Sequence, residues 1–496
     1  MFFNHNEMDR INAIIAEGAA SKMTDLEFIA REIWEWKRSI KRIIQLDGER
    51  YYNGDHDILN RKREVIGKGG KKVEVENLPN NQIVDNQYAK MVDQKVNYIL
   101  GKPITFKSKN EDYCKKLKKV LNRKFQRTLS SVADDAYNGG IAWLHPYYDK
   151  NGNFKFKKFP AYEILPFWKD AAHTELDAAV RYYTVTAYEG ETKTTIERVE
   201  VFDDRGIWRY VFDGGKLIPD IENPSTYHAT LVNDDGNVTG LTWERIPLVA
   251  FKANKKEIPL IKRVKFLQDG INDMLSTFKN NMEEDSRNTV LVIKNYDGQD
   301  LGEFRQNLST YGAVKVRTIE GSEGGVDTLK IEVNSANYES ILKLFKNALI
   351  ENARGYDAKD DRLNAQPNEM NLRSMYSDID LDANVIETEF QASFEDLLWF
   401  VNAYLSNSGN GDFDNEDVQI IFDRDIIVNE TEIIENCKNS KGLISDETII
   451  SMHPWTDDPQ EELKRLEKQR QKELELYGGF NDDPFKKKGG DDNGDD

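Results

Sequence analysis

The 496-residue chain contains only two cysteines, Cys114 and Cys437, which lie far apart and lack a CxxC or other metal-binding spacing. Two thiols are too few to cross-link a chain of this length, so we expect a protein of a reducing compartment. The first ten residues, MFFNHNEMDR, contain no basic stretch followed by an apolar core, and no run of about 18 apolar residues occurs. These absences argue against secretion and against a membrane-spanning segment.

Signatures of several enzyme classes are also missing. No G-x-x-x-x-G-K-[ST] motif occurs, and the glycine- and lysine-rich segment 67–71 lacks its spacing, which argues against an ATPase. No G-x-S-x-G motif is present and neither cysteine has a histidine nearby, so nucleophilic catalysis has no support. We expect no zinc site and no cofactor, because the six histidines lack i, i+4 pairs: His5, His56, His145, His173, His228 and His453. For His56 we expect a packing or hydrogen-bonding role.

Positive charge is scarce. Lysine and arginine number 68 against 87 acidic residues, so the net charge is 68 − 87 = −19. This balance argues against tight binding of phosphates over a large surface, but it suits a channel wall along which DNA slides, because fixed phosphate contacts would add friction. Hydrophobic residues make up 39% and charged residues 31%, which is ordinary for a subunit that buries surface against its neighbours.

Helical periodicity dominates the beginning of the chain. Apolar residues on one face, preceded by a capping box of Thr24 and Glu27, predict a helix over residues 24–46. Similar patterns predict helices over 87–100 and about 110–138. Between residues 141 and 251, short alternating segments separated by Asp-Gly turns instead predict an antiparallel β-rich region.

The second half alternates between long helices and short strands. A continuous apolar stripe predicts a helix over 259–284, and a second helix is predicted over 335–354. Between them we expect strands at 289–294, 313–317 and 329–333. After the polar segment 357–371 the pattern predicts a long helix over 372–405, then a strand at 419–422 and helices at 431–438, 446–452 and 458–476. The tail 481–496 has almost no apolar residue and is predicted to be disordered.

Several motifs, in this order, resemble those of portal proteins of tailed bacteriophages, of the type found in long-tailed phages of Gram-positive hosts. The most specific are Tyr51-Tyr52-x-Gly54-x-His56-x-Ile58 and the run Asn86 to Val92 that leads to Asn97-Tyr98-Ile99-Leu100-Gly101-Lys102-Pro103. Supporting motifs are Leu267-Gln268-Asp269 through Leu275-Ser276 and Gly442-Leu443-Ile444-Ser445-x-Glu447-Thr448. The chain departs from the family at Met370-Asn371-Leu372-Arg373-Ser374, where many relatives carry a stretch with Gly-Asn and Ser-Gly.

The resemblance implies a mostly helical α+β portal fold that assembles as a ring. It divides the chain into a wing at 1–255 and 372–430, stem helices at 256–284 and 335–356, a clip at 285–334, a tunnel loop at 357–371 and a crown at 431–480. Twelve copies would form a channel for double-stranded DNA at one capsid vertex, without enzymatic activity. The implied partners are the terminase large subunit, the major capsid protein, the scaffolding protein and a head-completion or adaptor protein, in the host cytoplasm during assembly and then in the virion, with no membrane.

Two sets of residues are candidates for contacts in such a channel. Residues expected to contact DNA are Lys262, Lys265, Lys279, Lys343 and Lys346 on the stem helices, and Lys359, Arg362, Asn364 and Gln366 in the tunnel loop. The alternative for the stem lysines is that they are solvated or paired with neighbouring acids. Candidates for partner docking in the clip, or alternatively for its core, are Tyr296, Phe304, Leu308 and Tyr311.

A second hypothesis is a DNA-processing enzyme of the phage head module. The carboxylates that could serve a two-metal nuclease are Asp357, Asp360, Asp361, Asp378, Asp380 and Asp382. Acidic residues this dense on a loop and at the start of a helix are more often solvated or favoured by the helix dipole, so we expect no metal site there.

Overall fold

The computed structural model describes residues 25–66, 70–76, 78–149, 151–232, 238–285, 289–294, 325–330, 335–357, 369–424, 430–456 and 458–477. The chain divides into two compact units, the first formed by residues 1–357 and 376–425 and the second by 358–375 and 426–496. Each unit is described by itself. Over the described ranges, no helix has both the length and the apolar character needed to cross a bilayer.

The helices of the first unit come from both ends of its sequence. They are α2 (Asp25–Trp36), α3 (Ile40–Tyr52), α4 (Gln87–Leu100), α5 (Glu111–Val120), α6 (Arg123–Gly139), α7 (Ile261–Asp285), α9 (Ser335–Ala353) and most of α10 (Glu369–Asn407), with short 3-10 helices at Asp57–Asn60 and Ala161–Glu163. The predicted helix over 87–100 is confirmed residue for residue as α4.

All strands pair antiparallel, as the alternating segments predicted. A five-stranded sheet has the order β10-β9-β8-β7-β6, from Lys216–Pro219, Ile207–Asp213, Thr192–Phe202, Leu176–Glu189 and Ile164–Trp168. A three-stranded sheet has the order β13-β4-β5, from Val249–Lys252, Ile141–Tyr148 and Phe154–Phe159. Smaller pairs are β1–β2 (Glu64–Ile66, Lys72–Glu74), β11–β12 (Ala229–Val232, Val238–Leu241), β16–β3 (Gln419–Ile421, Thr105–Lys107) and β14–β15 (Thr289–Lys294, Gly325–Lys330).

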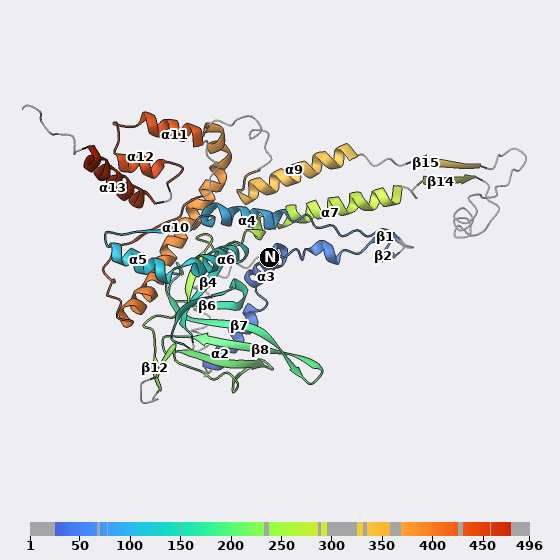
Figure 1. The fold of residues 1–496 in the computed structure, drawn as a ribbon. Helices are drawn as coiled ribbons and strands as arrows, with labels where there is room; N and C mark the ends of the chain where they lie inside the picture. Colours follow the sequence, from blue (N-terminus) through green and yellow to red (C-terminus); the bar gives the residue numbers. More distant parts are fainter. Residues whose placement is uncertain are drawn as a thin grey trace, which may run out of the picture. The chain divides into compact units, whose positions relative to one another are not determined.

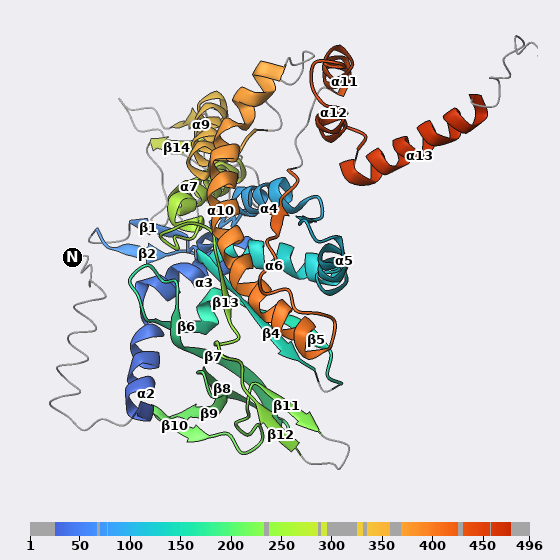
Figure 2. The same ribbon diagram turned by 90° about the vertical axis from the view of Figure 1, so that its left-hand side faces the viewer.

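Two core clusters of the first unit lie on the two faces of the five-stranded sheet. On one face α2 buries Ile33 and Trp36 against Val180 and its neighbours, and Figure 2 shows α2 beside β10. The other face packs against the three-stranded sheet, where Trp143 is fully buried. The strands contribute side chains to both clusters, because successive side chains of a strand point to opposite faces of the sheet.

Two segments that were each predicted as one helix form two helices in the structure, because a side chain caps the start of the second helix. The helix predicted over 24–46 is divided at residues 37–39, where Ser39 accepts the N–H of Arg42 and donates its hydroxyl to the carbonyl of Trp36. The helix predicted over 110–138 is divided at 121–122, where Asn122 accepts the N–H groups of Lys124 and Phe125. Such caps satisfy the free donors of a helix start and so favour a new helix over continuation.

The first unit includes a long helix pair, α7 and α9. α7 and α9 lie side by side, and the β14–β15 hairpin lies beyond their ends (Figure 1). The strand predicted at 289–294 is confirmed, whereas the one expected at 329–333 begins four residues earlier, at Gly325. The strand expected at 313–317 lies outside the described residues.

The second unit contains α11 (Glu430–Asn439), α12 (Asp446–Met452), α13 (Pro459–Tyr477) and the first turns of α10. The three predicted helices are thus confirmed within one residue of their bounds. α10 begins at Glu369, so the last three residues of the predicted 357–371 loop are helical. The tail 481–496 lies outside the described residues.

Replacing Gly48 with alanine should destabilise the first unit, because α3 and α6 cross there and a Cβ would overlap the carbonyl oxygen of Asn138. In an exposed helix the same change is stabilising by up to about 1 kcal/mol. Here we expect a loss of about 1–3 kcal/mol, measured as a lower urea midpoint. Gln391→Ala, at an exposed position of α10, is the control and should leave the midpoint almost unchanged. A stabilised Gly48→Ala variant would contradict the close approach.

Candidate functional site

One face of α7 carries a buried row of polar side chains, which we call the polar ladder. Its members, all fully buried and four residues apart, are Gln268, Asn272, Ser276 and Asn280. Four residues of helix rise about 6 Å, and two residues of extended chain advance about 6.6 Å. A row with this spacing can therefore satisfy alternate N–H groups of an extended segment.

The extended segment 81–85, which leads into α4, uses the ladder in this way. Its backbone bonds are Asn81 N–H to Asn280 Oδ1 (2.7 Å), Ile83 N–H to Ser276 Oγ (2.9 Å) and Asp85 N–H to Asn272 Oδ1 (3.0 Å). Gln268 ends the row by accepting the N–H of Tyr88 (2.9 Å) and donating to the carbonyl of Asp85 (2.7 Å). Backbone groups without a sheet partner are thus paired by a helix face.

His56 joins the polar ladder to the end of α3. Its ring is fully buried, with Nδ1 accepting from the side-chain amide of Asn272 (2.7 Å) and Nε2 lying 3.0 Å from the carbonyl oxygen of Tyr51. Burial lowers the pKa of His56, which favours the neutral ring that this pairing requires. The side chain of Asn86 also donates to the carbonyl of Tyr51, at 2.9 Å. The expected packing and hydrogen-bonding role of His56 is confirmed.

A charged cluster adjoins this pairing. The hydroxyl of Tyr51 donates to Asp269, and the ammonium of Lys265 contacts Tyr51 Oη (2.8 Å), Asp269 (3.0 Å) and Asp57. Although burial alone would lower the pKa of Lys265, hydrogen bonds to these acceptors raise it. Motifs that are more than 200 residues apart in the sequence, around residues 51–58 and 267–276, therefore meet at one place.

A second buried centre lies where α4 contacts the end of α9 and the middle of α10. The side chain of Lys95 is 0% exposed, and its ammonium binds Asp382 (2.7 Å) and the carbonyl of Arg354 (3.1 Å). Tyr137 donates its hydroxyl to the same carboxylate, at 3.2 Å. Burial lowers the pKa of Lys95, and the adjacent carboxylate of Asp382 opposes that shift.

α4 also holds the backbone on both sides of the segment 358–375. The side chain of Gln94 accepts the N–H of Tyr356 (3.0 Å) and donates to its carbonyl (2.9 Å). On the far side, the ring of Tyr376 stacks on Tyr98 of α4 and meets the edge of Tyr356, with centroids 5.8 and 4.7 Å apart. The two chain ends that border this segment are therefore fixed to one helix.

The whole chain compares well with one group of known proteins. The family model described as phage portal protein, SPP1 Gp6-like, matches residues 29–476. The chain belongs to this portal protein family. It is 30% identical over 453 residues to the portal protein of Bacillus phage SPP1, covering 90% of this chain and 87% of that protein. It is 27% identical over 471 residues to the portal protein of Clostridium phage phiCD119, covering 92% and 95%.

The expected resemblance to portal proteins of phages of Gram-positive hosts is thus confirmed. The role of a portal protein is structural rather than enzymatic, so the nuclease hypothesis is set aside. The structure also accounts for two of its carboxylates, since Asp382 is bound by Lys95 and Asp380 accepts from Tyr98 (2.6 Å) and Arg424 (2.8 Å). Within the described ranges, no group of three or more potential ligands could hold a metal ion. Asp360 and Asp361 lie outside those ranges.

The structure distinguishes among the five lysines of α7 and α9 that were expected to contact DNA. Lys265 is engaged in the charged cluster, Lys279 pairs with Glu283 (3.2 Å), and Lys346 pairs with Asp85 (2.7 Å), which fits the alternative of pairing with neighbouring acids. Lys262 and Lys343 are exposed and form no ion pair with any described residue. Candidates outside the described residues are Lys359, Arg362, Asn364, Gln366, Tyr296, Phe304, Leu308 and Tyr311.

The sequence analysis missed both the polar ladder and the buried Lys95. The helix was predicted from its apolar residues alone, and the polar ladder lies between them. The signal that could have shown the ladder is the repeated i, i+4 spacing of amide and hydroxyl side chains. Lys95 carries no comparable signal, because its carboxylate partner is 287 residues away.

Replacing Asn272 with alanine should destabilise the first unit. The change leaves the N–H of Asp85 and the Nδ1 atom of His56 buried without these partners, at a cost of about 1–3 kcal/mol. Urea denaturation followed by tryptophan fluorescence measures the loss. Lys279→Ala on the same helix removes only an exposed ion pair and should change the midpoint little. Equal midpoints for both variants would exclude a stabilising ladder.

Replacing Lys95 with methionine should cost about 3–5 kcal/mol, because the carboxylate of Asp382 would lose its buried partner. In the double variant Lys95→Met/Asp382→Leu no buried charge is left unpaired, and only the partly exposed Arg263, 3.9 Å from Asp382, loses an ion-pair partner, so most of the loss should be recovered. The urea midpoints of the single and double variants give the comparison. A double variant as unstable as the sum of both single variants would show that the two charges are not coupled.

Proposed function

We propose that this portal-family chain assembles into a ring of about twelve copies whose channel passes double-stranded DNA at one capsid vertex. The observation that carries the proposal is the α7–α9 pair. The helices pack antiparallel, with Gly270 against the ring of Phe345 and Phe278 near Tyr338, whose centroids are 5.0 Å apart. With 25 and 19 residues they are about 38 and 29 Å long, enough to form the wall of a tunnel.

The dimensions of such a ring agree with the passage of a duplex. Helix axes pack about 8–10 Å apart, so twelve helices give a ring of roughly 32–38 Å between opposite axes. Side chains of about 5 Å on each side leave an opening of roughly 22–28 Å. B-form DNA is roughly 20 Å wide and would fit with little clearance.

Exposed apolar side chains on this helix pair support contact between copies. Phe266 of α7 is 87% exposed, and Leu344 and Ile341 of α9 are 64% and 43% exposed. Contiguous apolar patches at a surface mark interaction sites. In the ring they would be covered by the next copy.

The charge of the chain supports loose rather than tight contact with DNA. The net charge is −19, and three of the five stem lysines are already paired within the chain. The other two, Lys262 and Lys343, are exposed. They are the remaining stem candidates for weak, salt-screened contacts with the phosphates of passing DNA. The candidates of the segment 357–371 keep their predicted role in the channel.

The division into wing, stem, clip, tunnel loop and crown follows the family resemblance, as do the partners. In this proposal the clip, which contains β14 and β15, docks the terminase large subunit during packaging and the head-completion or adaptor protein afterwards. The wing contacts the major capsid protein and the scaffolding protein. These assignments rest on the resemblance.

Electron microscopy and mass photometry of the purified chain test the ring. We expect closed rings of about twelve copies with a central opening wider than roughly 20 Å. Incubation with linear duplex DNA and magnesium should give no cleavage products. A protein that stays monomeric at every salt and protein concentration, also with its scaffolding and capsid proteins present, would refute the proposal.

Replacing Phe266 with glutamate should weaken ring formation, because a charge would enter the apolar contact between copies. We expect a shift toward monomers in mass photometry without a change in the circular dichroism spectrum. Tyr188→Glu, at a 70% exposed aromatic position on β7, is the matched control. Rings formed by Phe266→Glu as readily as by the control would remove this face from the interface.

A further inference from the structure

A cavity with a volume of about 490 Å³ lies between three segments of the first unit that are distant in sequence. Its walls come from the beginning of α3, from the turn between β6 and β7 at residues 171–173, and from residues 255–259 with Lys262 in the first turn of α7. Cavities of roughly 300–1,000 Å³ are typical of small-molecule sites. The family assignment gives the cavity no role, and the proposed ring uses only one of its lining residues, Lys262, as a candidate for contact with DNA.

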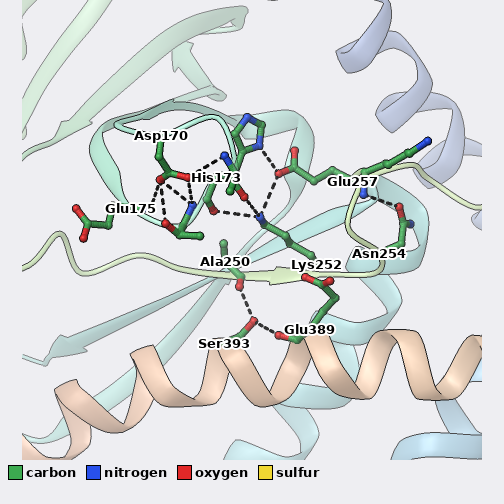
Figure 3. Close-up of polar contacts among 12 residues, drawn as sticks. Asp170, His173, Glu175, Ala250, Lys252, Asn254, Glu257, Glu389 and Ser393 are labelled. Atoms are coloured by element: carbon green, nitrogen blue, oxygen red, sulfur yellow. Dashed lines mark hydrogen bonds and ion pairs between the residues drawn. The ribbon is translucent and has the colours of Figure 1, made fainter.

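Side chains organise both loops that form this cavity (Figure 3). Asp170 accepts the N–H groups of Ala172 (2.8 Å), Thr174 (2.9 Å) and Glu175 (2.8 Å), which fixes the turn after β6. Asn254 accepts the N–H of Ile258 (3.1 Å) and donates to its carbonyl (2.8 Å), which fixes the loop before α7. The cavity is thus formed by loops with defined conformations.

The buried carboxylate of Glu257 holds the two loops together. It contacts His173 Nδ1 (2.6 Å) and the ammonium groups of Lys41 (2.7 Å) and Lys252 (3.6 Å). Burial alone would raise the pKa of Glu257. The hydrogen bonds from His173 and Lys41 outweigh burial and lower this pKa to about 2. Both Glu257 and His173 have left-handed backbones, with φ of 52° and 60°. This costly conformation of non-glycine residues is maintained where the surrounding structure requires it.

The mouth of the cavity is positively charged. Lys255, Lys256 and Lys262 line it, are exposed, and form no ion pair with any residue in the described part of the chain. The single lining carboxylate, Glu257, already has cationic partners. In a chain with a net charge of −19, this is a local excess of positive charge. The lining also includes the apolar residues Ile40, Ile44 and Ile258.

We propose that this cavity binds a small phosphate-bearing molecule of about mononucleotide size. The phosphate group lies among Lys255, Lys256 and Lys262, and the less polar part packs against the isoleucines. Lysine ammonium groups bind phosphate as point charges, and three exposed lysines line this cavity. A DNA duplex, roughly 20 Å wide, is too broad to enter.

Isothermal titration calorimetry on the full-length assembled protein tests the site, with thymidine 5′-monophosphate, inorganic phosphate and thymidine as separate probes. We expect saturable binding of the monophosphate at one site per chain and much weaker binding of thymidine. Inorganic phosphate distinguishes the source of the anion, since equal affinity would assign the site to free phosphate and weaker affinity to a nucleotide.

Two variants separate the cavity from general attraction between charges. Lys255→Gln/Lys256→Gln should weaken binding by about tenfold or more, as expected for lost charge-assisted hydrogen bonds. Lys118→Gln/Lys119→Gln, an exposed lysine pair at the end of α5, removes the same charge elsewhere and should leave the affinity unchanged. Ala171→Trp, which narrows the cavity without changing its charge, should also weaken binding.

Three results would overturn the proposal. The first is no binding of either phosphate probe up to millimolar concentration by a correctly assembled protein. The second is an equal loss of affinity in both lysine double variants, which would indicate non-specific attraction. The third is thymidine binding as tightly as its monophosphate. Thermal denaturation of each variant verifies that it is folded.

Discussion

The buried polar ladder on α7 is the interaction on which the arrangement of the helices depends. An extended segment cannot be buried unless its N–H groups find acceptors, and in residues 81–85 these acceptors are side chains of a helix. The match between a four-residue helical repeat and a two-residue extended repeat fixes the register of the two elements. Because residues 81–85 lead directly into α4, the ladder also determines where α4 begins.

α4 then connects this register to the rest of the first unit. Its first turn is positioned by the ladder and by Asn86, while Gln94, Lys95 and Tyr98 hold the end of α9 and the adjacent part of α10. The polar contacts along α4 are either buried or close to buried groups, where an unpaired donor or charge is costly. The helices α7 and α9 are thus both tied to α4.

Three of the five lysines of α7 and α9 that were expected to meet DNA are paired with acids of the same chain. Such pairing agrees with the proposed channel, because movement of DNA requires that no single contact be strong. Lys255, Lys256, Lys262 and Lys343 are exposed and form no ion pair with a described residue, and the first three line the cavity.

The sequence by itself determined most elements of this protein. Apolar periodicity and caps are local, so α4, β14 and α12 were predicted with their observed bounds, and the portal motifs identified the family. The missed breaks at Ser39 and Asn122 were also local, since each cap is visible in the sequence. Only the tertiary structure decided which polar groups meet, such as Lys95 with Asp382 and His56 with Asn272. These pairings join residues that are more than 200 positions apart in the sequence. The packing of helices and sheets decides which polar groups become buried and need a partner, and local sequence spacing does not record that packing.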